Sequence, residues 1–399
     1  MISSELNALR QKCADNCLNG GWPTGAVEEF KFTSLAELSF WPCDLPLAKQ
    51  TNLSFWQEHK LTDDVIVFEN GQLSQNTLSA QSGLTISSFS SLDEISPDMQ
   101  AQFANNSCAG QPFISQLNTA YFTSGLVLRI SKNQSIDKPI QIIFAQSSKE
   151  AASFFAKVFI VLEAGASCSV VETYVGDKQA DNYLSCVQIE ISLAEGAQLK
   201  HVKVGHNGES SYHLAGTRIH QAAHSNYEHG VFFYSGKLVR NEIYSVLQGQ
   251  GADVVLKGLS RLDGQEVVDN FINVEHAAPN CTSNQRFKGI YDGKSHGVFT
   301  GTIVVKEGAQ KTNGYQSNAN ILLSSTAKVD ARPQLKIWAD DVKCSHGETC
   351  GALDEEALFY LQARGIPQAQ AKQMLVTAFA QEIIDGINIP GAKEYLLNR

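Results

Sequence analysis

A repeat of about 30 residues constrains the fold of this chain more than any other feature of its sequence. Aligning Gly165-Ala166 with Gly196-Ala197 places Val158 opposite Ile189, and the apolar residues at 160 and 162 opposite those at 191 and 193. Further Gly-Ala pairs follow at 251 and 308, at intervals close to twice the same period. A fixed period of this length is typical of a solenoid, in which each turn is one repeat.

Beyond residue 117, short apolar segments alternate with glycine-containing turns and predict one strand after another. These segments include LVLRI, IQIIF, VQIEISL, TGTIVV and ANILLSS. No helical stretch of ten or more residues separates them, so a stacked β-solenoid fits better than a sheet built from βαβ crossovers. Because a single turn cannot bury its apolar face alone, the ends of the stack need caps.

Helical patterns at both ends of the chain could supply these caps. Near the start, Leu6, Leu9, Cys13 and Cys17 lie on one helical face. Packing is favoured over metal binding for the two cysteines, because they share a stripe with leucines. From about residue 50 to 115, short apolar runs alternate with polar clusters and show no clean period.

The C-terminal pattern predicts an αα-hairpin over residues 354–386. Acidic residues follow Asp354 in a first turn, and Arg364-Gly365 marks the end of the first helix. Pro367 opens the second helix. Its apolar stripe is formed by Ala371, Leu375, Ala378, Phe379 and Ile383. This face either covers the solenoid or binds a partner.

The composition disfavours some classes of binding partner and indicates a cellular compartment. The chain has 31 Lys and Arg against 41 Asp and Glu, a formal net charge of -10, so general binding to nucleic acid or to an acidic membrane is disfavoured. No apolar run is long enough to span a membrane, and no secretory signal is visible, so we expect a cytoplasmic protein. Nine scattered cysteines, an odd number, predict reduced thiols.

The candidate nucleotide-binding motifs lack glycines at the required positions. Gly293-Lys294-Ser295 resembles the end of a phosphate-binding loop, but Lys288 stands where the motif needs its first glycine, and a predicted strand follows. The dinucleotide fingerprint is also absent. We therefore expect no nucleotide site in this chain.

Two clusters contain metal-ligand residue types. One groups six histidines, His201, His206, His213, His220, His224 and His229, of which His220 and His224 could share an outer face. No cysteine or carboxylate stands at a matching offset to complete a site, so a structural role is favoured there. The second, denser cluster contains Cys344, His346 and Cys350, flanked by Asp340, Asp341 and Glu348, in a predicted loop before a helix.

The second cluster suits iron, iron–sulfur clusters or zinc. Cys344 and His346, two residues apart on an extended segment, would point the same way. Three potential ligands cannot complete a four-coordinate site, so a fourth would come from elsewhere, and a second subunit is one natural source. The alternative is a loop in which His346 only caps backbone groups.

Three segments of the sequence resemble the SufB/SufD family of iron–sulfur cluster assembly proteins. They are PTGAVEEFKFTSL near the N-terminus, the stretch from RLDGQEVVDNF to ANILLS, and ADDVKCSHGETCGALDEEALFYLQARGI. Ser345 and Gly347 replace the glutamates usual in SufB, which favours the SufD type. Asn313-Gly314 departs from the usual Asp-Ala, which weakens a role for position 313 in iron binding.

The resemblance implies a right-handed parallel β-helix over residues 116–345, between an N-terminal helical and mixed domain (1–115) and a C-terminal helical domain (346–399). It also implies a non-enzymatic scaffold subunit that works with SufB and with the ATPase SufC, in iron acquisition and de novo cluster assembly. His346 and Cys344 would be ligands of a transient cluster or iron shared with SufB. Phe359, Leu375 and Phe379 would be anchors for SufC.

Two other functions stay open from the residues alone. Long β-helices also host carbohydrate-active enzymes, although no repeated column of acids is visible here. A stand-alone metal-binding module that uses the histidine cluster is the other alternative. The exposed edge of a solenoid could also pair two copies of the chain as a homodimer, and the sequence says nothing of a flavin.

Overall fold

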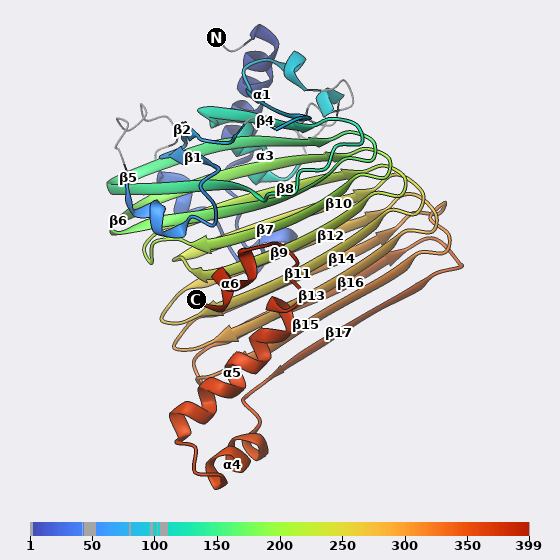
Figure 1. The fold of residues 1–399 in the computed structure, drawn as a ribbon. Helices are drawn as coiled ribbons and strands as arrows, with labels where there is room; N and C mark the ends of the chain where they lie inside the picture. The colour runs from blue at the N-terminus through green and yellow to red at the C-terminus, as the bar shows by residue number, and fades with distance from the viewer. Residues whose placement is uncertain are drawn as a thin grey trace.

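The main body of the chain is a parallel β-solenoid with two strands in each turn (Figure 1). The structure is a computed structural model that describes residues 3–41, 43, 53–79, 81–95, 99–101, 103 and 111–398. Strands alternate between two sheets, so that β10 (Leu238–Leu247) pairs in parallel with β12 (Val267–His276), whereas β11 (Asp253–Leu262) pairs with β13 (Thr282–Tyr291). The expected solenoid is confirmed.

We call the sheet that the N-terminal helices cover the N-side sheet, and the sheet that the C-terminal helices cover the C-side sheet. Two long strands, β5 (Ile140–Leu162) and β6 (Ser167–Leu193), cross from the second sheet into the first. The N-side sheet contains β3 (Leu84–Ser88), β4 (Ser124–Ile130), the second halves of β5 and β6, β8 (Tyr212–Gln221), β10, β12, β14 (His296–Val305) and β16 (Lys328–Ile337).

The C-side sheet begins with an antiparallel pair. It contains β2 (Gln72–Asn76), β1 (Val65–Glu69), the first halves of β5 and β6, β7 (Gln198–His206), β9 (Asn226–Ser235), β11, β13, β15 (Asn313–Leu322) and β17 (Lys343–Gly351). β1 thus joins the stack although it lies within residues 1–115, and β17 runs past residue 345 to Gly351.

The predicted 31-residue repeat matches the register in which β5 and β6 pair. Val158 pairs with Ile189, and the two following inward positions pair in the same register. Three of the corners that follow N-side strands contain a glycine with positive φ, at Gly165, Gly196 and Gly251. His224 (φ 57°) and Asn280 (φ 59°) have positive φ at the intervening corners, where no Gly-Ala pair occurs, and at the corner of Gly308 the residue with positive φ is Lys311 (φ 59°).

Alternation along the strands divides the residues into an interior and two outer faces. The interior core is mainly aliphatic, with Ile189, Ile219 and Ile272 fully buried. The outer faces are also buried where helices cover them. Polar side chains can also occur in the solenoid interior where a neighbouring turn supplies their hydrogen-bond partners.

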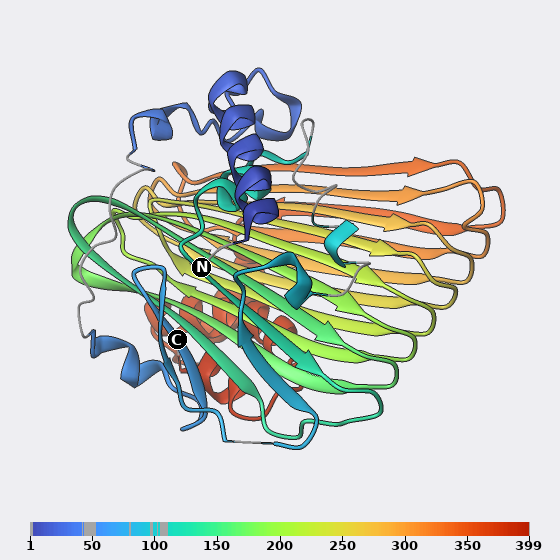
Figure 2. The ribbon, with the colours of Figure 1, turned by 90° about the horizontal axis from the view of Figure 1, so that it is seen from above.

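The N-terminal region covers the outer face of the N-side sheet (Figure 2). Leu6 and Cys13 of α1 (Ser4–Gly20) are buried and Cys17 is half-buried, so packing of this stripe is confirmed. Other helical elements before β4 are η1 (Glu28–Phe30), η2 (Ala36–Phe40), η3 (Phe55–His59), η4 (Leu92–Glu94) and α3 (Phe113–Tyr121). Of these, η3 packs on the C-side sheet, where Trp56 shares a cluster with Val67 and Ile143.

Three C-terminal helices follow β17, and the predicted hairpin is confirmed. They are α4 (Glu355–Ala363), α5 (Gln368–Ile384) and α6 (Ala392–Leu397). The Asp354 carboxylate caps α4 by accepting from two backbone N–H groups. The buried face of α5 is centred on Val376 and Ile383 and packs on the C-side sheet, whereas Ala378, expected in the stripe, is exposed. No helix among the described residues is long and apolar enough to cross a membrane.

Candidate functional site

Four side chains with potential ligand atoms lie on one face of the last strand. The segment expected to be a loop is strand β17, and its alternation places Cys344, His346, Glu348 and Cys350 together on the inward side. In register they lie opposite four residues of β15 that are buried in the interior. These are Gly314, Gln316, Asn318 and Asn320.

β17 is the open end of the stack. Among the described residues it pairs with β15 alone, and β16 pairs with β14 alone. His346 and Cys350 are exposed, although residues at the same positions in earlier turns are covered by the next strand. An uncovered edge presents backbone N–H and C=O groups that another strand can pair with.

Cys344 is the least exposed of the four side chains on this face. It packs against Ile303 and Val305 of the neighbouring N-side sheet, and its Sγ lies close to Gly314. Burial raises the pKa of the Cys344 thiol, and a hydrogen bond with the Gly314 backbone opposes the shift. The thiol must therefore lose a proton before it can bind a metal.

The spacing on β17 separates the three predicted ligands. Cys344 and His346 are two residues apart, about 7 Å along a strand, whereas Cys350 is about 20 Å from Cys344. The two thiols of β17 therefore cannot bind one metal ion together. Among the described residues, no three His, Cys, Asp or Glu side chains gather around one point. Asp340 and Asp341 lie in the turn before β17 and are exposed.

The histidine cluster does not form one site in the structure. His201, His213 and His229 lie inside the solenoid and are almost fully buried. His201 Nδ1 lies 2.8 Å from the Tyr227 hydroxyl, and its ring stacks on His229 with centroids 4.2 Å apart. His220 and His224 do not share an outer face, because β8 ends at Gln221 and His224 occupies the corner that follows.

The interior histidines belong to a charged layer that the sequence did not reveal. Glu172 accepts a hydrogen bond from Tyr174 and pairs with His201. Lys203 Nζ donates to Thr217 Oγ1 at 2.8 Å and to Asn241 Oδ1 at 3.3 Å.

Neighbouring groups keep Glu172 charged although it is buried. Burial alone would raise the pKa of Glu172, but Lys203, His201 and Tyr174 together lower it to about 2. Burial also lowers the pKa of His213 to about 3, and Lys203 adds to that shift. We define Glu172, His201, Lys203, His213 and His229 as the interior charged layer. Only the register places them together, because Glu172 pairs with Lys203 across a 31-residue offset.

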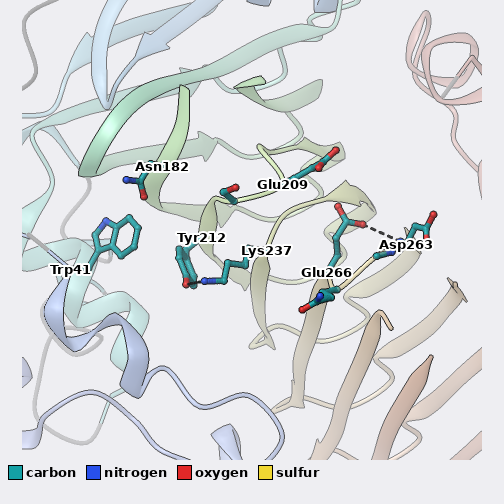
Figure 3. A pocket seen from close by; sticks show the side chains of 10 residues that line it. Trp41, Asn182, Glu209, Tyr212, Lys237, Asp263 and Glu266 are labelled. Carbon is teal, nitrogen blue, oxygen red and sulfur yellow. Dashed lines mark hydrogen bonds between the residues drawn. The ribbon is translucent and has the colours of Figure 1, made fainter. Parts of the chain in front are cut away.

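A cavity of about 730 Å³ lies at the turns that precede β8, β10 and β12 (Figure 3). Trp41 packs edge-on against Tyr212, whose hydroxyl contacts Lys237. Both carboxylate oxygens of Glu266 accept backbone N–H groups, one of them from Asp263. The aromatic rings and carboxylates here thus hold the turns together, and this cavity lies apart from β17.

The predicted partner anchors on the C-terminal hairpin are placed differently from one another. Phe359 of α4 is 72% exposed, whereas Leu375 and Phe379 are half-buried. Lys288 lies over the Phe379 ring and donates to its backbone oxygen at 3.0 Å, so Phe379 helps attach α5 to β13. Phe359 is therefore the most available of the three for a partner.

Gly293, Lys294 and Ser295 form the turn between β13 and β14. Gly293 has positive φ, and β14 begins at His296. A strand follows the glycine-lysine-serine segment, as expected, where a phosphate-binding loop would open a helix. The geometry of this segment is that of a solenoid corner.

Comparisons with known proteins agree with this architecture. The SufBD core domain of the SUF system for iron–sulfur cluster assembly matches residues 144–379, and the SufBD N-terminal region matches residues 1–142. The iron–sulfur cluster assembly SufBD family protein slr0076 of Synechocystis is 30% identical over 395 residues, which cover 95% of this chain and 86% of the relative. SufD of Escherichia coli is 32% identical over 275 residues, 68% of this chain and 65% of the relative.

A β-solenoid flanked by helices, matched along almost its whole length, defines the class: this chain belongs to the SufBD family of iron–sulfur cluster assembly proteins. Within that family its likeness is to SufD, since relatives from both Escherichia coli and Bacillus subtilis carry that name, the second at 24% identity over 71% of this chain. The resemblance seen in the sequence is confirmed. A relative from Arabidopsis, 28% identical over 396 residues, is described as chloroplastic.

Proposed function

We propose that this chain is a non-catalytic scaffold subunit of a complex with a SufB-like protein and a SufC-like ATPase. In this role it contributes to iron acquisition and de novo cluster assembly where its open end meets the SufB-like partner. The observation that carries the proposal is the pair Cys344 and His346, which faces the interior side of a strand that, within the described part of the chain, no further strand covers.

The geometry explains why a partner is needed. One thiol and one imidazole about 7 Å apart supply too few ligands for a four-coordinate site. A strand added to the free edge of β17 would bring its own side chains opposite Cys344 and His346 and could complete the coordination. The transient cluster or iron is then cargo shared between the two chains, with Cys350 available at the far end of the same strand.

The test is anaerobic reconstitution with iron and sulfide after co-expression with and without both partners. Cluster absorbance should require the partners and should fall at least several-fold in His346→Ala and Cys344→Ala. Ser345→Ala is the matched control, because Ser345 lies between these residues and faces the opposite side of β17. Full absorbance in His346→Ala, with the complex intact, would assign the ligands to the partner and leave this chain an architectural role.

The C-terminal hairpin supports docking of the ATPase. Phe359 and Tyr360 of α4 expose large aromatic rings, and α4 lies beyond the last turns of the solenoid (Figure 1). Exposed aromatic anchors of this kind dominate many interfaces. Phe359→Ala should weaken co-purification of the SufC-like protein, whereas Thr377→Ala, on an exposed position of α5, should not. Equal co-purification of both variants would place the ATPase elsewhere.

A further inference from the structure

The residue beneath His346 in the stack is a glutamine with an unused acceptor. Gln316 of β15 is in register with His346, and both side chains face the solenoid interior. Parallel neighbours in register lie about 4.8 Å apart, so their side chains on the same face are in contact range. Gln316 is fully buried, whereas His346 is exposed.

The amide of Gln316 is oriented by the turn before it. Its Nε2 donates to Gln285 Oε1 of β13 at 3.3 Å, which commits the amide nitrogen to the preceding strand. Its Oε1 is buried and has no hydrogen-bond partner among the described residues. A buried carbonyl without a donor is costly, so an arrangement that supplies one is favoured.

A glycine on the opposite sheet makes room for this side chain. A Cβ at Gly301 of β14 would clash with Gln316 Nε2, so the amide reaches across the interior only because position 301 has no side chain. The position of Gln316 is therefore fixed from two directions, by Gln285 within its own sheet and by Gly301 across the interior.

We propose that Gln316 is a positioning residue for His346: its Oε1 accepts the N–H of one imidazole nitrogen and leaves the other nitrogen as the acceptor for a metal. An imidazole ligand of a metal usually donates its second N–H to a carbonyl or carboxylate, which fixes the tautomer and the ring orientation. This role rests on the proposed function of His346, but the proposed hydrogen bond between Gln316 and His346 can be tested without it.

Histidine-selective ¹⁵N NMR of the full chain tests the contact without any metal. Spectra are recorded about two pH units above 6.5, the ordinary histidine value, and His346→Ala assigns the signal. In the wild type, one ring nitrogen should keep the proton. In Gln316→Met, of similar length but without the acceptor, the two ring signals should move towards each other as the tautomers exchange.

Three further variants make this test selective. Gln316→Glu keeps an acceptor oxygen and should preserve the wild-type pattern. Gly301→Ala, which displaces the amide without altering either partner, should reproduce the Gln316→Met pattern. Gln373→Met on the exposed face of α5 is the control for the substitution itself and should change nothing. Identical His346 ring shifts in the wild type and in folded Gln316→Met would overturn the proposal.

Reconstitution of the complex then separates this inference from the proposed function. Loss of an outer hydrogen-bond partner typically lowers metal affinity 10- to 100-fold, so the Gln316→Met complex should need correspondingly more iron. If the tautomer changes but neither Gln316→Met nor His346→Ala affects the cluster, the contact stands and the proposed function fails. If only His346→Ala affects the cluster, the positioning role fails.

Discussion

The interior and the open end of one inward-facing column contain the same kind of residue in opposite situations. His201 and His229 occupy this column inside the solenoid, and continuing the register through Leu256, Gln285 and Gln316 leads to His346 at the open end. Inside, each imidazole is buried between two turns. At the open end, His346 has a neighbouring strand on one side only among the residues that the structure describes. Residue type alone therefore does not identify the candidate site, and position in the stack does.

The adjacent column repeats the contrast with charges. Glu172 and Lys203 are in register and fully buried, so each compensates the other. Glu348 ends the same column on β17 and is exposed. Charges that are paired in the interior stabilise one register of the strands, whereas the charge at the open end is free to meet a partner.

The largest expected effect is a difference in the free energy of unfolding between a variant of the interior and a variant of the open end. Glu172→Leu leaves Lys203 buried without its counter-charge and should lower the free energy of unfolding by roughly 3–5 kcal/mol. His346→Leu, at an exposed site, should change it by no more than about 0.5 kcal/mol. Urea denaturation measures both.

The double variant Glu172→Leu/Lys203→Met is the control, since removing both charges should restore much of the stability lost in Glu172→Leu. Equal losses of unfolding free energy for Glu172→Leu and His346→Leu would contradict the distinction between the interior and the open end.

A second prediction concerns pH and the buried imidazoles. The pKa of His213 is about 3, and burial lowers the pKa values of His220 and His276 to about 4. The unfolded chain therefore binds protons below about 6.5 that the folded chain does not, so stability is lost as the pH falls from that value. Each such group contributes a slope of up to about 1.4 kcal/mol per pH unit.

The test compares urea denaturation of the wild type and His213→Leu between pH 4.5 and 6.5 (about two units below the ordinary histidine value). The variant should show a flatter dependence, because His213 has no hydrogen-bond partner for its ring nitrogens among the described residues and one titrating group is removed. The same slope in both proteins would count against a neutral His213 in the interior.

The smallest effect concerns reactivity and does not involve stability. Among the thiols of the solenoid, Cys350 is exposed, Cys344 is half-buried, and Cys168, Cys186 and Cys281 are buried. Alkylation of the native chain followed by mass spectrometry should modify Cys350 first, then Cys344, and the buried thiols only after unfolding. Modification of Cys281 as fast as Cys350 would show that the solenoid opens.

Much of the fold was predictable because the repeat lies in the residues that form the corners and the core. The 31-residue offset from Val158 to Ile189 is the observed register. Some corners could not be recognised from the sequence, since His224 and Asn280 adopt the left-handed conformation without being glycine. The strand at 343–351 was predicted as a loop because its inward residues are polar, and only its pairing with β15 makes it a strand.

The candidate site was predictable in its residue types and not in its geometry. Cys344 and His346 do point the same way, as an extended segment requires, but sequence proximity also suggested Cys350, which the strand carries about 20 Å away. The interior charged layer and Gln316 escaped prediction, because their partners come from neighbouring turns about 30 residues distant in sequence. Aligning successive repeats and comparing the residues at each inward position could have identified them.

Hydrogen–deuterium exchange of β17, in this chain alone and after addition of the SufB-like partner, tests most directly whether the open end is the partner-completed site. We expect fast exchange for the outward-directed amides of residues 343–351 in the chain alone and strong protection in the complex, while the interior strands β9 and β11 stay slow in both. A complex that forms with exchange of β17 unchanged would contradict it.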